Sequence, residues 1–125
     1  MTKLFILALM IFCHIVDDYY LQGILASMKQ KKWWETNAPD PLYKNDYVVA
    51  LITHGFSWAF MIMLPIAVFY GFNPPLHFWT CFVANAVTHS FIDNLKANKL
   101  KINLITDQVL HYVQIIVTYL FIVAL

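Results

Sequence analysis

Two His/Asp pairs, each spaced by four residues, are the part of this sequence best placed to do chemistry. His89 precedes Asp93, and Asp107 precedes His111, so the second pair mirrors the first. Four residues make about one turn of an α-helix, and the two side chains of each pair therefore share a helix face. Only the short loop at residues 96–103 separates the two helices, so the two faces can meet. Imidazole nitrogens and carboxylate oxygens together are typical ligands of zinc, non-haem iron and manganese.

Two earlier apolar stretches add polar side chains to these pairs. His14, Asp18 and Gln22 repeat every four residues in the first stretch, and His54 stands alone in the second. We predict a divalent-metal site, with zinc as the first choice and iron or manganese as alternatives. The predicted ligands are His14, His54, His89, Asp93, Asp107 and His111. Because this set exceeds the needs of one tetrahedral ion, a two-ion site is a second option.

Other residues near these ligands have predicted roles in catalysis or support. Asp18 is the expected general base, and Lys96, in helical register with Asp93, is expected to hold an anionic group at the rim of the site. Asp17 points about 100° away from Asp18 on an α-helix and is left outside the site. The supporting polar residues are Gln22, Asn85 and Gln108.

Simpler interpretations remain open for single residues. His54 alone is compatible with a packed or hydrogen-bonded histidine, and the series that begins at His14 is compatible with a hydrogen-bond ladder between helices. The mirrored pairs carry the strongest signal, because two such pairs on consecutive helices are hard to explain by packing alone.

The composition is that of a membrane protein rather than a soluble one. The 125 residues are 61% hydrophobic and 12% charged, with a net charge of +1. A soluble domain this small could not bury so much apolar surface. No basic patch or nucleic-acid motif is present, and Cys13 and Cys81 lack the spacing of a disulfide framework.

Four apolar stretches are long enough to cross a ~30 Å hydrocarbon core at ~1.5 Å per residue. They cover residues 4–28, 47–71, 76–95 and 104–125. We therefore predict an all-α, integral membrane four-helix bundle that forms a single domain over residues 1–125. An Asp at the centre of a membrane helix costs ~2.5–3.5 kcal/mol on insertion scales, so these carboxylates need partners inside the bundle.

The distribution of lysines predicts the orientation of the bundle. Lys3 lies at one end, and the other lysines fall on the loops between spans one and two and between spans three and four. By the positive-inside rule that side is cytoplasmic, so both termini lie outside (N-out/C-out). Between the first two spans, Trp33 and Trp34 accompany several lysines. This segment is expected to lie on the membrane surface, where such residues are common.

The order of these motifs resembles a known family. HxxxDYxxQ from His14, the lone His54, HxxIDxxK from His89 and DQxxH from Asp107 resemble the small bacterial and phage integral membrane proteins of domain of unknown function 3307. The resemblance covers nearly the whole chain and implies a multi-pass protein of the bacterial inner membrane, of bacterial or phage origin. It implies no activity. More loosely, the one-turn spacing of His and Asp is similar to that of membrane-bound metal-dependent hydrolases.

Three functions fit these features. The first is a metal-dependent hydrolase that acts from the cytoplasmic side on a membrane or amphiphilic ester or phosphoester, such as a lipid phosphate. The second is a proton or metal-ion pathway, although the residues beyond His14 toward the outer face are apolar and a homo-oligomer would be needed to continue the path. The third is a structural role in which polar residues fix helix register. The lipid bilayer is the expected partner in each case.

Overall fold

The computed structural model describes residues 2–125, and this part of the chain is helical without any β-strand. Helices labelled α are α-helices, and those labelled η are short π- or 3₁₀-helices. In chain order they are α1 (Lys3–Ile15), η1 (Val16–Leu21), α2 (Leu25–Met28), α3 (Lys31–Asn37), η2 (Pro41–Tyr43), α4 (Asp46–Phe69), α5 (Leu76–Ala97), α6 (Leu104–Tyr119) and η3 (Leu120–Ala124). The predicted all-α class is confirmed.

The first helix changes type where it carries two acidic residues. α1 continues directly into the π-helix η1, in which each turn takes in one more residue than an α-helical turn. This wider turn lets both Asp17 and Asp18 face the interior, where both are buried. The helix expected over residues 4–28 is interrupted after Leu21, because Gly23 has φ +55°, a left-handed conformation that glycine adopts at low cost.

The remaining long helices begin and end close to the predicted bounds. α4, α5 and α6 with η3 occupy the ranges expected for the second, third and fourth spans. Three helical stretches are long and apolar enough to cross a membrane: Lys3–Leu21, Pro41–Phe69 and Leu104–Ala124. α5 is long enough but less apolar, because its second half carries polar residues that include His89 and Asp93.

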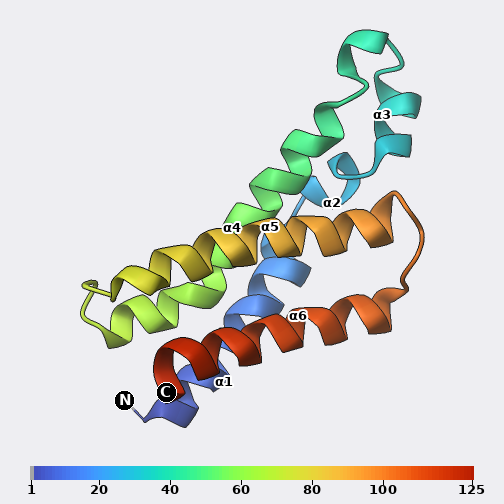
Figure 1. The fold of residues 1–125 in the computed structure, drawn as a ribbon. Coiled ribbons are helices and arrows are strands. Elements are labelled where there is room, and N and C mark those ends of the chain that lie inside the picture. The colour runs from blue at the N-terminus through green and yellow to red at the C-terminus, as the bar shows by residue number, and fades with distance from the viewer. Residues whose placement is uncertain (1) are drawn as a thin grey trace.

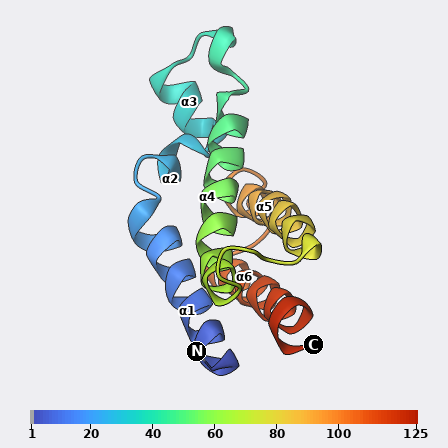
Figure 2. The same ribbon diagram turned by 90° about the vertical axis from the view of Figure 1, so that its left-hand side faces the viewer.

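The four long helices pack together without forming one parallel bundle. α5 and α6 run side by side, while α1 and α4 cross them obliquely (Figure 1). α4 packs mainly against α1 and α5. In the view turned by 90°, α1 and α4 run upward together and α5 and α6 lie to one side (Figure 2). This crossing directs one face of each long helix toward a common point.

The two lysine-rich loops meet at one end of the molecule. The side chain of Asn98, after α5, accepts a hydrogen bond from the Lys31 backbone at 2.6 Å and donates one to the Lys29 carbonyl at 2.9 Å. Beyond this contact, α3 packs against the first turns of α4 and extends past the other helices (Figure 1). At the opposite end the termini lie together, and Lys3 Nζ contacts the Ala124 carbonyl at 3.4 Å.

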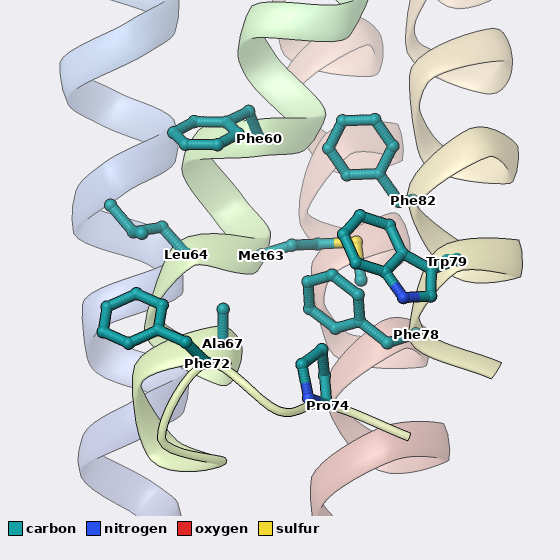
Figure 3. A pocket seen from close by; sticks show the side chains of 9 residues that line it. All are labelled: Phe60, Met63, Leu64, Ala67, Phe72, Pro74, Phe78, Trp79 and Phe82. Carbon is teal, nitrogen blue, oxygen red and sulfur yellow. The ribbon is translucent and has the colours of Figure 1, made fainter. Parts of the chain in front are cut away.

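The interior has an apolar half and a polar half. Toward the termini the core is built from apolar side chains, among them Ile6, Met10, Ile66 and Ile122. In this half, α4 and α5 border a pocket of about 200 Å³ that is lined only by apolar and aromatic residues (Figure 3). The buried His and Asp side chains lie in the other half, nearer the lysine-rich loops. The pocket of Figure 3 is therefore not the site predicted from the sequence.

Candidate metal centre

Side chains from all four long helical stretches converge on one buried cluster. Their donor atoms form two groups, and within each group the atoms lie within 4.8 Å of one another, close enough that the group could hold a metal ion. Each residue is between 0% and 8% exposed. The cluster consists of Asp18 from η1, His54 from α4, His89 and Asp93 from α5, and Asp107 and His111 from α6.

The first group joins Asp18, His54, His89 and Asp93. Nε2 of His54 lies 3.2 Å from Asp18 Oδ1 and 3.5 Å from Asp93 Oδ2. Nε2 of His89 lies 3.6 Å from the same Asp93 oxygen and 4.0 Å from Asp18 Oδ1. Donor atoms that share a tetrahedral ion at about 2.0–2.2 Å lie roughly 3.3–3.6 Å apart. These four atoms are thus spaced to bind one ion after small adjustments.

The second group joins Asp107 and His111 on α6 with Asp18. Nε2 of His111 lies 3.4 Å from Asp107 Oδ1 and 3.4 Å from Asp93 Oδ1. The mirrored pairs seen in the sequence are therefore in contact through His111 and Asp93. This contact is the meeting of the two helix faces that the spacing predicts.

Several of these atoms are buried without a hydrogen-bond partner. Among residues 2–125, the atoms without one include both ring nitrogens of His89, Nε2 of His111, and Oδ1 of both Asp93 and Asp107. A buried polar atom that lacks a partner costs about 1–3 kcal/mol, and more if it is charged. Lone pairs of nitrogen and oxygen that converge in this way match the ligand set of a divalent cation.

The other ring nitrogens of two histidines face polar neighbours, His54 an Asp17 oxygen beyond hydrogen-bond length and His111 a hydrogen-bond partner. His54 Nδ1 lies 3.7 Å from Asp17 Oδ2, and the other oxygen of Asp17 accepts a 2.6 Å hydrogen bond from Ser57. His111 Nδ1 lies 3.4 Å from the Gln114 side-chain oxygen. A hydrogen bond such as that of His111 fixes the ring orientation of a metal-binding histidine, which would leave Nε2 free for an ion.

His14 is placed differently from the other histidines. Trp58 Nε1 donates a 2.8 Å hydrogen bond to His14 Nδ1, and because indole is only a donor, the proton of a neutral His14 ring must reside on Nε2. That nitrogen lies 3.0 Å from the side-chain oxygen of Gln108. Gln108 Nε2 in turn donates to Asp18 Oδ2 at 2.8 Å and to Asp107 Oδ2 at 3.1 Å. Both ring nitrogens of His14 are thus in hydrogen bonds. His14 is therefore placed to orient two carboxylates of the cluster through Gln108.

The first testable prediction concerns this chain of hydrogen bonds. Trp58→Phe removes the donor that fixes His14 and is expected to lower metal affinity about tenfold, as loss of such supporting partners typically does. Affinity is measured by competition with a chromophoric chelator in detergent. Trp79→Phe is the matched control, because Trp79 is 57% exposed and lies in the apolar half. Equal affinity in the two variants would contradict the positioning role of His14.

Two lysines contact carboxylates of the cluster. Lys29, between α2 and α3, donates to Asp93 Oδ2 at 2.6 Å and is buried. Lys96 donates to Asp107 Oδ2 at 2.8 Å, and its side chain is 28% exposed. The sequence predicts Lys96 near the site but places Lys29 on the surface, because nothing in a loop segment indicates that it folds back over the helix ends.

The carboxylates in and beside the cluster outnumber the lysines that pair with them. Asp17, Asp18, Asp93 and Asp107 carry four negative charges when ionised, and two lysines supply two positive ones. With neutral imidazoles, two negative charges remain in a buried site. Buried charges are strongly unfavourable unless compensated, and one divalent cation would compensate these two.

The second prediction tests the competition between Lys29 and a metal ion for Asp93. Lys29→Met keeps the length of the side chain and removes its charge. Without metal, the variant is expected to be destabilised by about 3 kcal/mol, the lower end of the cost of breaking a buried pair. Its metal affinity is expected to rise, because the carboxylate no longer shares its charge with an ammonium group.

Thermal unfolding with and without metal, together with affinity, measures both effects. Lys32→Met is the control, since Lys32 is exposed. Unchanged affinity in Lys29→Met would mean that Lys29 and the ion do not share Asp93.

The supporting residues predicted from the sequence lie around the cluster. Gln22 donates to the Asp18 backbone carbonyl at 2.8 Å. Asn85 is linked to the cluster through Gln114: it contacts the Gln114 side chain at 3.3 Å and donates a hydrogen bond to Thr118 at 2.8 Å. Gln108 is the most closely involved, because it contacts two carboxylates of the cluster.

Four residues in or beside the site are missing from the sequence prediction: Asp17, Lys29, Trp58 and Gln114. Trp58 lies one helical turn after His54, and this spacing could have identified it.

Fold and cluster together define a class: an all-helical protein with helices apolar enough for a membrane and a buried His/Asp group compatible with metal binding. The chain belongs to the family described as Protein of unknown function (DUF3307), which matches residues 6–125. The family resemblance seen in the motifs is therefore confirmed. No curated protein and no solved structure matches the chain. Because the family description names no activity, any function must be argued from the site itself.

Proposed function

We propose that this protein is an integral membrane metalloenzyme that hydrolyses an ester or phosphoester of an amphiphilic substrate from the cytoplasmic side. The observation that carries the proposal is the convergence of buried donor atoms without hydrogen-bond partners in residues 2–125, His89 Nε2 and His111 Nε2 foremost. Six donor residues reach this point from four helical stretches. Helical bundles commonly build metal sites in this way, from inward-pointing side chains.

The proposed membrane arrangement has four spans with both termini outside. Three helical stretches are apolar enough to cross a bilayer, and α5, between α4 and α6, is long enough to be the remaining span. The lysine-rich loops lie together at the end opposite the termini, which supports a cytoplasmic location for them. We place the protein in the bacterial inner membrane, with α3 near its surface.

A divalent ion held by the cluster would polarise a carbonyl or phosphoryl oxygen and lower the pKa of a bound water toward ~7. Zinc is the first choice, since the donors are imidazole and carboxylate, and iron or manganese would also fit. Asp18 is proposed as the general base, a role in which it would accept a proton from the bound water rather than ligate the ion. At 8% exposed it is the least enclosed carboxylate of the cluster, and Gln108 holds its Oδ2 at 2.8 Å, which leaves Oδ1 to face the donor atoms.

Lys96 is proposed to hold the anionic part of the substrate. Its side chain is partly exposed at the lysine-rich end, and its ammonium group lies 2.8 Å from Asp107. A substrate phosphate could therefore contact the ammonium group from the aqueous side while its ester bond faces the cluster. A site near the membrane surface suits an amphiphilic molecule, such as a lipid phosphate or another lipid-linked ester.

The alternative is a proton or metal-ion pathway, and one observation favours it. From His111 a line of polar contacts continues through Gln114 and Asn85 to Thr118, toward the end with the termini. This line meets the apolar core that includes Ile115 and Ile122. The apolar core supports the hydrolase over the pathway for a single copy of the chain.

A hydrolysis screen tests the proposal. Purified protein in detergent, loaded with zinc, manganese or ferrous iron, is incubated with phosphomonoesters, phosphodiesters and carboxylic esters that carry lipid tails. The proposal predicts turnover of one class and its loss in Asp18→Asn. Metal-loaded protein that cleaves none of these classes, but carries ions across the membrane of proteoliposomes, would favour the pathway instead.

A further inference from the structure

We infer that the cluster binds two divalent ions, joined by the carboxylate of Asp93. The inference rests on the proposed metal-binding function and deepens it, because it assigns each donor to one of two positions. It starts from two overlapping groups of donor atoms: Asp18 belongs to both, and Asp93 of the first group also lies 3.4 Å from His111 Nε2 of the second.

Apart from Asp18, which both groups share, the members of the two groups come from different helices. In one, His54 on α4 and His89 on α5 point Nε2 toward Asp18 Oδ1 and Asp93 Oδ2, at distances between 3.2 and 4.0 Å. In the other, His111 on α6 points Nε2 toward Asp107 Oδ1. A single ion with bonds of about 2.0–2.2 Å has no room for three imidazoles and three carboxylates. Two ions divide these donors into sets of ordinary size.

Asp93 lies between the two positions and faces both. Its Oδ2 lies 3.5 Å from His54 Nε2 and 3.6 Å from His89 Nε2, whereas its Oδ1 lies 3.4 Å from His111 Nε2. The two oxygens of one carboxylate therefore serve different histidine sets. A carboxylate used in this way bridges two ions, and two-ion hydrolytic sites hold their ions about 3.5–4 Å apart.

The two positions offer different ligands. The position between α4 and α5 has two imidazoles and the Asp93 carboxylate, a set that suits zinc or iron, with Asp18 beside it as the proposed base. The position at α6 has one imidazole, from His111, and otherwise carboxylates, which suits a harder ion such as manganese or magnesium. We therefore expect the α6 position to bind zinc more weakly than the other.

The net charge of the site with two ions bound suggests how the second ion would affect the choice of substrate. One divalent ion neutralises the two uncompensated charges of the cluster, and a second leaves an excess of two positive charges. A bound hydroxide or the phosphate of a substrate would reduce that excess. The two-ion centre is therefore expected to favour anionic substrates, as the position of Lys96 at the rim also suggests.

Manganese titration of the purified wild-type protein tests the inference. Free Mn²⁺ is followed by its electron paramagnetic resonance signal, and bound manganese is also counted by elemental analysis. We expect two ions per chain at saturation, with an exchange-coupled signal from the pair. His54→Phe and His111→Phe, which retain a buried ring, are each expected to bind one ion and to lose the coupled signal. His77→Phe, at an exposed histidine, is expected to match the wild type.

The result that overturns the inference is a wild type that saturates at one ion per chain without coupling; metal binding itself would then stand. A wild type that binds no manganese, zinc or iron would overturn both this inference and the proposed function. Gel filtration and circular dichroism are recorded for each variant. If one variant fails to fold, the stoichiometry and coupled signal of the wild type still decide between one ion and two.

Discussion

Replacing Asp93 with asparagine is expected to lower metal affinity by more than about 100-fold, beyond the range typical for residues that only support a ligand. Asp93 lies at the centre of the cluster, and its two oxygens lie within 3.6 Å of ring nitrogens on three helices. The amide keeps the shape but loses the charge and one acceptor. Metal content after dialysis and the affinity from chelator competition measure the effect.

The same substitution leaves the buried Lys29 without its ion pair. Asp93→Asn alone is therefore expected to lose stability as well as metal, since an unpaired buried charge is costly. The double variant Lys29→Met/Asp93→Asn removes both charges and is expected to recover stability without recovering metal. This pair of variants separates the loss of a ligand from the loss of the fold.

Asp107→Asn provides a comparison, and Asp46→Asn a control outside the cluster. Asp107→Asn is also expected to lower metal affinity. Its partner Lys96, however, is partly exposed and can turn toward water. Expression of Asp107→Asn should therefore persist. Unchanged metal content in both Asp93→Asn and Asp107→Asn would mean that these carboxylates neither bind the ion nor position its ligands.

The other large effect is expected at Gly55, where α4 lies in close contact with α5. A Cβ added to this residue would lie 2.6 Å from the Ala86 carbonyl oxygen and would also clash with the Ser90 hydroxyl. The serine side chain can rotate away, but the backbone carbonyl of α5 cannot, so the helices must separate. Gly55→Ala is expected to destabilise the protein by about 1–3 kcal/mol, the usual cost of overpacking.

The metal site should respond to this separation more sharply than the fold does. His54 is the neighbour of Gly55 in the chain, and it shares its proposed ion with His89 and Asp93 on α5. Because metal–ligand distances tolerate only about 0.2 Å, a small displacement of α5 is expected to lower metal affinity at least about tenfold. Small residues at helix contacts in membranes generally allow the helix backbones to approach closely.

Gly71→Asn is the control for Gly55→Ala. Gly71 has φ +59° and no atom within 4 Å of an added Cβ, and asparagine tolerates this conformation better than most residues. Adding Ser90→Ala to Gly55→Ala is expected to restore only part of the stability, since the clash with the Ala86 carbonyl remains. Wild-type metal affinity in Gly55→Ala would contradict the close packing of α4 on α5 as a determinant of the site.

The helical spacing of polar residues predicted much of the cluster. His89 with Asp93 and Asp107 with His111 meet as expected, because residues four apart share a helix face and a short loop joins the two helices. Asp18 and His54 also reach the cluster. For the residues on α4, α5 and α6, regular α-helix geometry was enough to place the side chain, whereas Asp18 lies in the π-helix η1.

The residues that were missed depend on departures from that geometry. Asp17 faces the interior because η1 is a π-helix, and no simple periodicity in the sequence predicts this change from α-helix to π-helix. Lys29 reaches Asp93 because the chain folds back after Gly23, a tertiary contact that the composition of a loop does not reveal.

His14 shows a different limit of sequence reasoning. Its position among inward-facing polar residues was predictable, but its role depends on which atoms it contacts. Trp58 and Gln108 occupy both of its ring nitrogens, and only the structure brings these two residues beside it. A histidine on the correct face can therefore be a ligand or a positioning residue, and helical spacing does not distinguish the two.

The metal content of the purified protein is the most direct test of the proposed metal centre. Wild type and His89→Phe are purified in detergent without a histidine tag or chelators and analysed by elemental mass spectrometry. His89 is fully buried, and phenylalanine preserves its stacking on Trp58 while removing both nitrogens. We expect zinc, iron or manganese at one or two ions per chain in the wild type and a marked loss in a folded His89→Phe. Folded wild-type protein without metal, even after incubation with these ions, would contradict this expectation.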